Sequence, residues 1–313
     1  MSATSPLAAS DGAATKSTSQ DGEELVLRAI LDRLPKPTGW GVEFGAWDGR
    51  YLSNSYSLIT DDGWHAVLIE SDPKQFQKLL KTWHAEPRVT SLNRIVGWTG
   101  KGALDAILSE TDIPQEFDLL SIDIDGNDYH VWEAVVAYRP RVVLIEFNQT
   151  IPNRVDFVQP ADTSVNQGSS IRAMVRLGKS KGYELVATTT FNAFFVAEQY
   201  LSELQIEDNS IECLRPEEGS VTDIFVGYDG TVFLTGSRVL PWHNLAMHGS
   251  RFQVLPRYLR RYPLDYRRWQ LALYYLYRGR DIVKRSDSSG HGLALFRTKL
   301  RVGLRGLSRG AKG

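Results

Sequence analysis

The sequence has little cysteine, no long apolar run and almost no net charge. Its 313 residues include a single cysteine, Cys213, so a disulfide within the chain is excluded, as is usual in a reducing compartment. No apolar run approaches the ~18 residues of a membrane-spanning helix. The amino terminus shows no basic segment followed by an apolar core, so it does not resemble a secretory signal. These absences predict a cytoplasmic protein with an ordinary packed core.

The signatures of several enzyme classes are missing as well. The sequence contains no zinc-site spacing and no legible Ser–His–Asp or Cys–His nucleophile set. The dinucleotide fingerprint G-x-G-x-x-G is absent, because Trp47 stands where its second glycine would be. A calcium loop beginning at Asp123 is excluded, because its twelfth position is Ala134 rather than glutamate. Asp123, Asp125 and Asp128 follow a strand end instead, where their carboxylates are expected to face the cleft at the edge of the sheet. For Asp125 and Asp128 a cap on the following helix is the alternative, and for Asp128 it is the preferred one.

The near-zero net charge hides a division of the chain into an acidic and a basic part. Residues 238–313 contain 17 lysines and arginines and 3 acidic residues. Residues 1–237 contain 19 lysines and arginines and 34 acidic residues. From Arg251 onward the arginines interleave with tyrosines and tryptophans. Such a segment is typical of contact with an anionic surface, or of docking on the acidic part of the same chain.

Three partners fit this basic segment. Amphipathic, arginine-rich segments bind anionic lipid, so we expect a membrane contact through residues 251–285, at the inner face of the membrane. Nucleic acid is the weaker alternative, because the segment holds many large apolar residues that need burial besides arginines that can contact phosphates. Docking on a second subunit, in a homo-oligomer, is the third.

Strand-like and helix-like segments alternate between residues 22 and 200. Strands are predicted at 40–44, 66–70, 89–96, from 117, and at 142–147, 183–189 and 193–197; helices are predicted at 22–34, 53–60, 73–83, 104–108, 129–138 and 171–181. Strands that alternate with helices form a parallel sheet with right-handed crossovers. Because the last two strands follow each other directly, the prediction is an α/β protein with a Rossmann-like sheet that is mostly parallel and has an antiparallel last strand.

The segment from Trp40 to Gly49 is the centre of this pattern. Glu43 lies at the end of the first strand, and Gly45 and Gly49 follow in a turn where the backbone can approach a ligand closely. Glu70 ends the second strand, where a carboxylate accepts hydrogen bonds from ribose hydroxyls. A carboxylate such as Glu43 suits a cationic ammonium and repels a pyrophosphate. This favours S-adenosylmethionine as the cofactor; an ordinary strand-to-helix turn is the alternative.

Polar residues also follow the next two strands, at the same edge of the sheet. Asp123 is expected in the cleft as a catalytic residue, and His130 is a second candidate base, although a histidine on a helix is more often structural. Glu146 and Asn148 share one face of the next strand. Together with Asp123 they offer oxygen ligands for a divalent cation such as Mg²⁺. A hydrogen-bonded strand end is the alternative to this metal site.

A long loop without periodicity covers residues 150–169. Loops of this length in compact domains are often functional, and its end is rich in amide and hydroxyl side chains that suit a polyhydroxylated substrate. A turn with a helix cap is the alternative, in which Ser169 or Ser170 supplies the cap. The candidate substrate-binding residues are Asn148, Asn166, Gln167 and Ser169.

Four short motifs carry a resemblance to a known family. They are Glu43-Phe44-Gly45-Ala46-Trp47-Asp48-Gly49, Glu70-Ser71-Asp72-Pro73, Ser121-Ile122-Asp123-Ile124-Asp125-Gly126-Asn127-Asp128, and Pro140 with Glu146. Residues 40 to about 198 resemble an FkbM-type methyltransferase, a family of the class I S-adenosylmethionine-dependent fold. The chain departs from the family pattern at Trp47, where asparagine is usual, and at Ser121, where lysine is usual. The resemblance does not reach the basic segment.

The resemblance implies an enzyme, because members of that family mostly methylate hydroxyls of sugars or natural products. The candidate cofactor-binding residues are Glu43, Gly45, Ala46, Gly49, Glu70 and Asp123. We expect an S-adenosylmethionine-dependent O-methyltransferase acting on a hydroxyl of a sugar, glycan or glycolipid-like acceptor. The alternatives are a nucleic-acid methyltransferase that uses the basic segment, and a non-catalytic membrane-associated or assembly protein that keeps the fold. The expected parts are a disordered leader at 1–21, a catalytic domain at 22–200, and a hairpin with a basic, aromatic-rich helical extension at 201–313.

Overall fold

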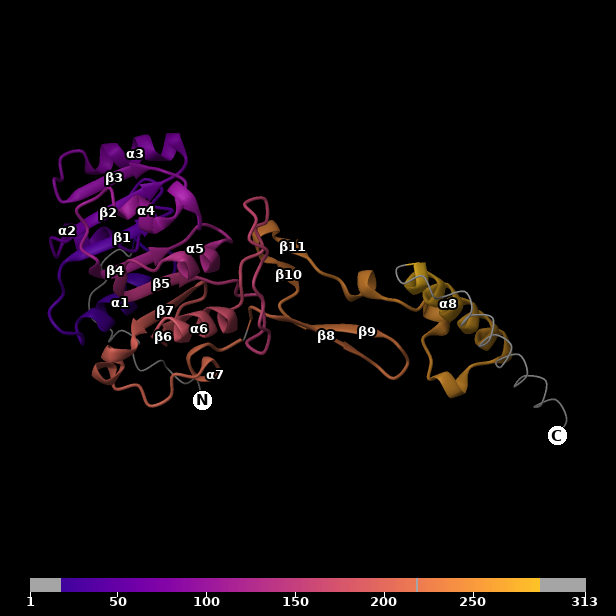
Figure 1. Ribbon diagram of the computed structural model, residues 1–313. Coiled ribbons are helices and arrows are strands. Elements are labelled where there is room, and N and C mark those ends of the chain that lie inside the picture. Colours follow the sequence, from indigo (N-terminus) through magenta and orange to yellow (C-terminus); the bar gives the residue numbers. More distant parts are fainter. Residues whose placement is uncertain (1–17, 218, 288–313) are drawn as a thin grey trace. The chain divides into compact units, whose positions relative to one another are not determined.

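The computed structural model describes residues 18–217 and 219–287, with side chains described up to residue 279 (Figure 1). The chain divides into two compact units, which we call unit 1, Met1–Val221, and unit 2, Thr222–Gly313. The strands of unit 1 are β1 Trp40–Phe44, β2 His65–Glu70, β3 Val89–Asn93, β4 Glu116–Ile122, β5 Arg139–Glu146, β6 Tyr183–Thr188 and β7 Asn192–Ala197. Its α-helices are α1 Glu23–Leu31, α2 Tyr56–Thr60, α3 Pro73–Trp83, α4 Leu104–Leu108, α5 Asp128–Ala134, α6 Ile171–Ser180 and α7 Ile211–Leu214, with 3₁₀ helices η1 Gly100–Gly102 and η2 Glu198–Leu204.

The seven strands of unit 1 form one sheet in the order β3-β2-β1-β4-β5-β7-β6. The pairs β2–β3, β1–β2, β1–β4 and β4–β5 are parallel, whereas β7 runs antiparallel to both of its neighbours, β5 and β6. The predicted Rossmann-like methyltransferase sheet is therefore confirmed, including its antiparallel last strand in chain order. Right-handed crossovers bring the carboxyl ends of the parallel strands to one edge. We call this edge the carboxyl edge.

Helices cover both faces of the sheet. On one face α1 packs on β4, β5 and β7, with Leu27 and Ile30 fully buried against Leu119 and Val142. On the same face α2 and α3 cover β2. Helices α4, α5, α6 and α7 contribute to the core on the other face, where Trp132 is fully buried. Burial on both sides explains why the central strands read as continuous apolar runs rather than alternating ones.

Two boundaries of the catalytic part differ between the sequence prediction and the structure. Unit 1 extends to Val221 rather than to about residue 200, because Leu204, Ile211, Leu214 and Val221 are buried in it. At the other end, residues 18–21 were expected in a disordered leader, but Ser19 is buried and Thr18 is hydrogen-bonded to Glu24. Residues 1–17 of that leader lie outside the described residues.

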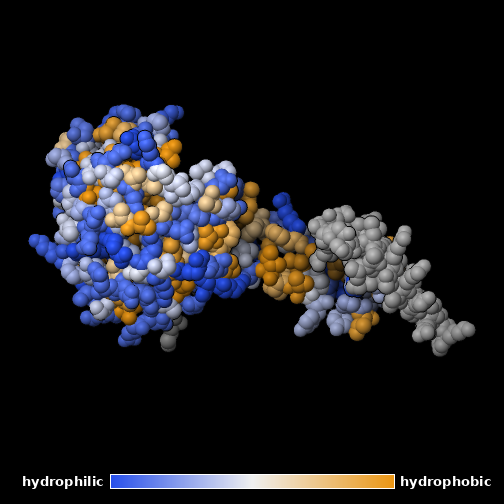
Figure 2. All heavy atoms as spheres, in the orientation of Figure 1, coloured by the Kyte–Doolittle hydropathy of each residue, from blue (hydrophilic) through white to orange (hydrophobic). Residues whose placement is uncertain are grey.

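Unit 2 begins with the predicted hairpin. The hairpin consists of β8 Thr222–Val226 and β9 Val232–Gly236. The rest of unit 2 holds β10 Val239–Leu240, β11 Leu245–Ala246, four 3₁₀ helices and α8 Arg268–Asp287. The 3₁₀ helices are η3 Pro241–His243, η4 Gly249–Phe252, η5 Arg257–Leu259 and η6 Pro263–Asp265. Gln253 holds the hairpin from outside, since its amide exchanges hydrogen bonds with the backbone of Val232. Hydrophobic side chains gather on the hairpin surface in Figure 2. Across the described residues, no helix combines the length and the apolar character needed to cross a membrane.

Candidate active site

The glycine turn after β1 brings the chain close to the end of β4. Gly45 has φ +75°, and a Cβ at this position would overlap the carbonyl oxygen of Asp123. Gly49 also has positive φ and lies against the Trp83 ring, which donates from Nε1 to the Gly49 carbonyl oxygen at 3.1 Å. Both glycines are therefore needed for conformation and for space. Ala46 donates its N–H to the carbonyl oxygen of Ile69, which ties the turn to β2.

Glu70 lies buried at the end of β2, beside this turn. Its carboxylate accepts hydrogen bonds from the N–H of Trp47 at 2.8 Å and from the N–H of Asp72 at 2.6 Å. Trp47 adopts a left-handed conformation with φ 50° within this turn. A carboxylate accepts about four hydrogen bonds, so Glu70 keeps capacity for the two hydroxyls of a ribose. The structure thus brings Glu70 and the glycine turn together, as the spacing predicted.

Glu43 is buried and accepts hydrogen bonds from the segment that follows the turn. Its carboxylate accepts from the Ser53 hydroxyl at 2.8 Å, from the Asn54 N–H at 2.8 Å, and from both the N–H and the hydroxyl of Ser55. The Asn54 side chain then donates to the Ser121 hydroxyl at 3.1 Å, which connects this segment to β4. Glu43 therefore positions residues 53–55 at the carboxyl edge, and its direct contact with a cofactor stays a prediction.

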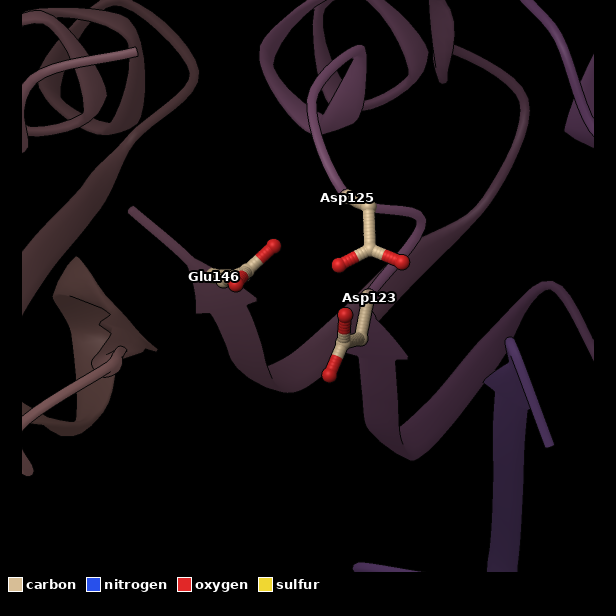
Figure 3. Close-up of side chains that lie close together, drawn as sticks. All are labelled: Asp123, Asp125 and Glu146. Atoms are coloured by element: carbon tan, nitrogen blue, oxygen red, sulfur yellow. The ribbon is translucent and has the colours of Figure 1, made fainter. Parts of the chain in front are cut away.

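Three carboxylates meet at the ends of β4 and β5. One oxygen from each of Asp123, Asp125 and Glu146 lies within 4.8 Å of the others, and Figure 3 shows the three groups turned toward one another. We call this set the acidic cluster. The sequence predicted Asp123 and Glu146 as ligands at this place, and it predicted Asp125 at the cleft but not as a ligand. Asp125 reaches it because its backbone is left-handed, with φ 57°, directly before Gly126.

Burial and mutual repulsion raise the pKa of two members of the acidic cluster, Asp123 and Glu146. Burial, together with the carboxylates of Asp128 and Asp125, raises the pKa of Asp123 to about 8. Burial and the Asp123 carboxylate also raise the pKa of Glu146 well above its usual value. Carboxylates this close cannot all ionise unless a cation compensates their charge. The cluster can therefore hold either protons or a divalent cation with oxygen ligands.

Asp128 closes the turn between β4 and α5. Its carboxylate accepts from the N–H groups of Ile124 and Gly126, both at 2.9 Å, and burial raises its pKa to about 6. It was expected to cap the helix; the recorded bonds instead hold the turn that precedes the helix. This turn presents Asp125 to the acidic cluster.

The other predicted metal ligand, Asn148, is hydrogen-bonded within the loop that follows β5, and its role as a ligand stays a prediction. Its side-chain oxygen accepts from the N–H and hydroxyl of Thr150, and its Nδ2 donates to the Gln167 carbonyl oxygen at 2.7 Å. Of the predicted substrate residues, Asn166 and Gln167 are exposed and Ser169 is buried. The cap of α6 is Ser170, whose hydroxyl accepts from the Ala173 N–H.

Gln159 organises this loop, and sequence reasoning missed it. The side chain is buried, and its oxygen accepts from the N–H groups of Gln167 and Gly168 at 2.9 and 2.8 Å. Its Nε2 donates to the carbonyl oxygen of Val165 at 3.0 Å. The only signal in the sequence was a glutamine in a long loop, and such a residue does not show which groups it binds. The loop that holds Asn166 and Gln167 is thus fixed from inside.

His130 is bound to the same loop residue. Its Nε2 lies 2.8 Å from the Gln159 carbonyl oxygen, and a carbonyl can only accept, so Nε2 carries the hydrogen. The Nδ1 atom lies 3.8 Å from a carboxylate oxygen of Glu133. The ring also packs against Trp98 and Tyr129. These contacts give His130 a structural role, and its role as a base stays a prediction.

Residues 18–24 cross the carboxyl edge. The Thr18 hydroxyl donates to the carbonyl oxygen of Ser53 at 3.3 Å, and the fully buried Glu23 accepts from Nδ2 of Asn192 at 3.3 Å. Ser53 follows β1 and Asn192 begins β7, and the sheet order places β4 and β5 between them. The segment before α1 therefore spans the strand ends that carry the acidic cluster.

The strand order, with antiparallel β7, is that of the expected Rossmann-like methyltransferase sheet. No family model matches the sequence, and no curated protein sequence matches it. The fold assignment therefore rests on the strand order itself.

Solved structures give matches to part of the chain. The CMeT domain of the citrinin polyketide synthase is 13% identical, with 56% of this chain and 51% of that chain covered and a TM-score of 0.37. The N-terminal domain of EvdMO1, in the presence of SAH and D-fucose, is 11% identical, with 61% and 91% covered and a TM-score of 0.37. A SAM dependent methyltransferase from Aquifex aeolicus is 12% identical, with 56% and 89% covered and a TM-score of 0.35. At these values the matches carry no argument about cofactor or substrate.

Proposed function

We propose that this protein is an S-adenosylmethionine-dependent O-methyltransferase that acts on a hydroxyl of a sugar, glycan or glycolipid-like acceptor. The observation that carries the proposal is the buried Glu70 beside the glycine turn at the carboxyl edge of a methyltransferase sheet. The similarity of four motifs to the FkbM-type family supports the same assignment. The exposed amides of Asn166 and Gln167 suit a polyhydroxylated acceptor.

The residues at the carboxyl edge fit the cofactor. Gly45 lets the backbone pass without a Cβ, and Glu70 keeps capacity to accept from ribose hydroxyls. When bound, S-adenosylmethionine supplies a methyl group on a sulfonium centre, which passes in line to the acceptor oxygen. The protein contributes mainly by holding the two groups in line and close together.

The acidic cluster is proposed to handle the acceptor proton. A carboxyl with a pKa of about 8, as in Asp123, has the proton affinity that suits a general base near neutral pH. If Asp123, Asp125 and Glu146 held Mg²⁺, the three carboxylates would serve as ligands, and the cation would lower the pKa of the acceptor hydroxyl. Titration with and without magnesium distinguishes these two uses.

The first test is calorimetric titration of the full chain with S-adenosylhomocysteine. We expect micromolar binding, and we expect Glu70→Ala to weaken it by about tenfold or more, since charge-assisted hydrogen bonds contribute ~1.5–3 kcal/mol. The matched control is Glu116→Ala, an exposed carboxylate at the opposite, amino end of β4. Thermal melts establish that each variant is folded. Absence of binding by folded wild-type protein, or equal affinity for Glu70→Ala, would contradict the proposal.

A further inference from the structure

Helix α8 of unit 2 exposes a stripe of apolar side chains. Trp269 is 51% exposed, Leu276 is 63% exposed, and Ala272 between them is also exposed. These residues stand at positions i, i+3 and i+7, so they lie on one face of the helix. Gln270, about 100° round the helix from Trp269, is buried, and its Nε2 donates to the Tyr258 carbonyl oxygen at 2.7 Å. The helix is thus fixed in unit 2 with its apolar stripe outward.

The loop before α8 continues this surface. The ring of Tyr258 lies 6.3 Å from the ring of Trp269, and both are about half exposed. Leu264 is 86% exposed and Tyr262 is also exposed. The loop is held in place by Tyr266, whose hydroxyl donates to the Leu259 carbonyl oxygen at 2.7 Å. We call the exposed side chains of 258–264 together with the stripe of α8 the apolar surface of unit 2.

The segment that forms the apolar surface is rich in arginine. Residues 251–279 contain seven arginines, at 251, 257, 260, 261, 267, 268 and 278, and one acidic residue, Asp265. On the helix Arg268 is exposed directly beside Trp269. A helix with tryptophan and leucine on one face and arginine beside them is the arrangement of segments that lie in the membrane interface. Arginine near such a surface is attracted by anionic headgroups.

From these observations we infer that unit 2 docks on an anionic lipid bilayer through the apolar surface, without spanning it. The exposed aliphatic side chains Leu264 and Leu276 decide between lipid and nucleic acid. Aliphatic side chains make no favourable electrostatic contact with phosphates, and they cannot stack on bases as aromatic rings do. Their transfer from water into the acyl layer of a membrane, in contrast, has a favourable free energy. Such docking would hold the proposed methyltransferase near a lipid-linked acceptor, but the docking itself does not depend on that activity.

The test is flotation of the full chain with two kinds of vesicle, pure phosphatidylcholine and phosphatidylcholine with about 30% phosphatidylserine. We expect binding to the anionic vesicles at least ~10-fold tighter than to the neutral ones, and a loss of that binding at ~1 M salt. The double variant Trp269→Ser/Leu276→Ser should weaken binding by ~10-fold or more. Both side chains are exposed, so the variant keeps its fold.

The matched control is Ile95→Ser/Val136→Ser, which removes two exposed apolar side chains from unit 1 and should leave binding unchanged. Equal binding to both vesicles, or equal loss in the control variant, overturns the proposal. So does displacement from the vesicles by single-stranded RNA, which would assign the surface to nucleic acid. If Trp269→Ser/Leu276→Ser instead abolishes self-association in sedimentation and leaves lipid binding intact, the partner is a second copy and the proposal fails. Failure of S-adenosylhomocysteine binding would leave the docking result standing.

Discussion

At the residue scale, Asp123 is the side chain where burial and charge oppose each other most clearly. Burial and neighbouring carboxylates raise its pKa from the ordinary 3.8 to about 8. A carboxyl with a raised pKa binds its proton more tightly in the folded chain than in the unfolded one. Its contribution to stability is therefore fully present below pH 4 and is lost as the pH rises toward 8. Such strain is common where a site is built for chemistry rather than stability.

Asp123→Asn tests this conflict, because the amide keeps the shape and cannot ionise. In the presence of a chelator we expect the variant to melt ~2–4 °C above wild-type protein at pH 8.5, corresponding to about 1 kcal/mol, with little difference at pH 5. Differential scanning calorimetry at both pH values measures this. Asp112→Asn, at an exposed aspartate, is the control and should show no such divergence. A difference of equal size at both pH values would show that the charge of Asp123 is not the cause.

The residues at strand ends were predictable, whereas their neighbours in space were not. Glu43, Glu70 and Glu146 could be placed because a buried strand followed by a carboxylate is a local pattern. Asp125 was predicted at the cleft but not as a ligand beside Asp123 and Glu146, because its exact place depends on a left-handed φ at a residue other than glycine. Aspartate adopts that conformation more often than most residues do, but the sequence does not show which aspartate of this segment adopts it.

At the element scale, the loop between β5 and α6 shows how a segment without secondary structure can be fixed. Its backbone N–H groups at 167 and 168 and its carbonyl at 165 meet one buried amide, that of Gln159. The carbonyl oxygen of Gln159 in turn lies 2.8 Å from the His130 ring on α5. The loop is therefore held by the side chain of its own residue Gln159, and the contact with His130 connects it to α5.

We expect Gln159→Ala to loosen this loop. The change leaves two N–H groups and one carbonyl without their partner, at a cost of about 1–3 kcal/mol for each group that stays buried. Hydrogen exchange should accelerate at residues 165–168 while the central strands stay protected. Gln167→Ala is the control, since its side chain is exposed and the loop bonds use its backbone. Unchanged exchange in Gln159→Ala would remove this residue as the organiser of the loop.

The limits of sequence reasoning at this scale follow from distance along the chain. The strands and helices between residues 40 and 197 were placed within a few residues, because their apolar periods are local. His130 and Gln159 are 29 residues apart, and no local pattern in either segment predicts that they are in contact. The prediction of His130 as a candidate base therefore did not include its contact with Gln159.

At the scale of the whole molecule, the chain combines two units of different character. Unit 1 holds the complete sheet and every residue proposed to bind the cofactor, among them Gly45, Glu70 and Asp123. Unit 2 holds the apolar surface and the arginine-rich segment that forms it. Charge follows nearly the same division, since residues 1–237 carry most acidic groups and residues 238–313 nearly half of the basic ones. Cofactor binding and surface attachment are thus expected to be separable.

A chain that ends at Val221 tests this separation. It keeps the core of unit 1, so we expect a folded protein that binds S-adenosylhomocysteine within about threefold of the full chain, because a threefold change is only ~0.6 kcal/mol. The same chain should lose its preference for phosphatidylserine vesicles, since the arginines and the apolar surface are gone. Calorimetric titration and flotation of the two proteins side by side measure both properties. A folded chain of this length without cofactor affinity would mean that unit 2 supplies part of the binding site.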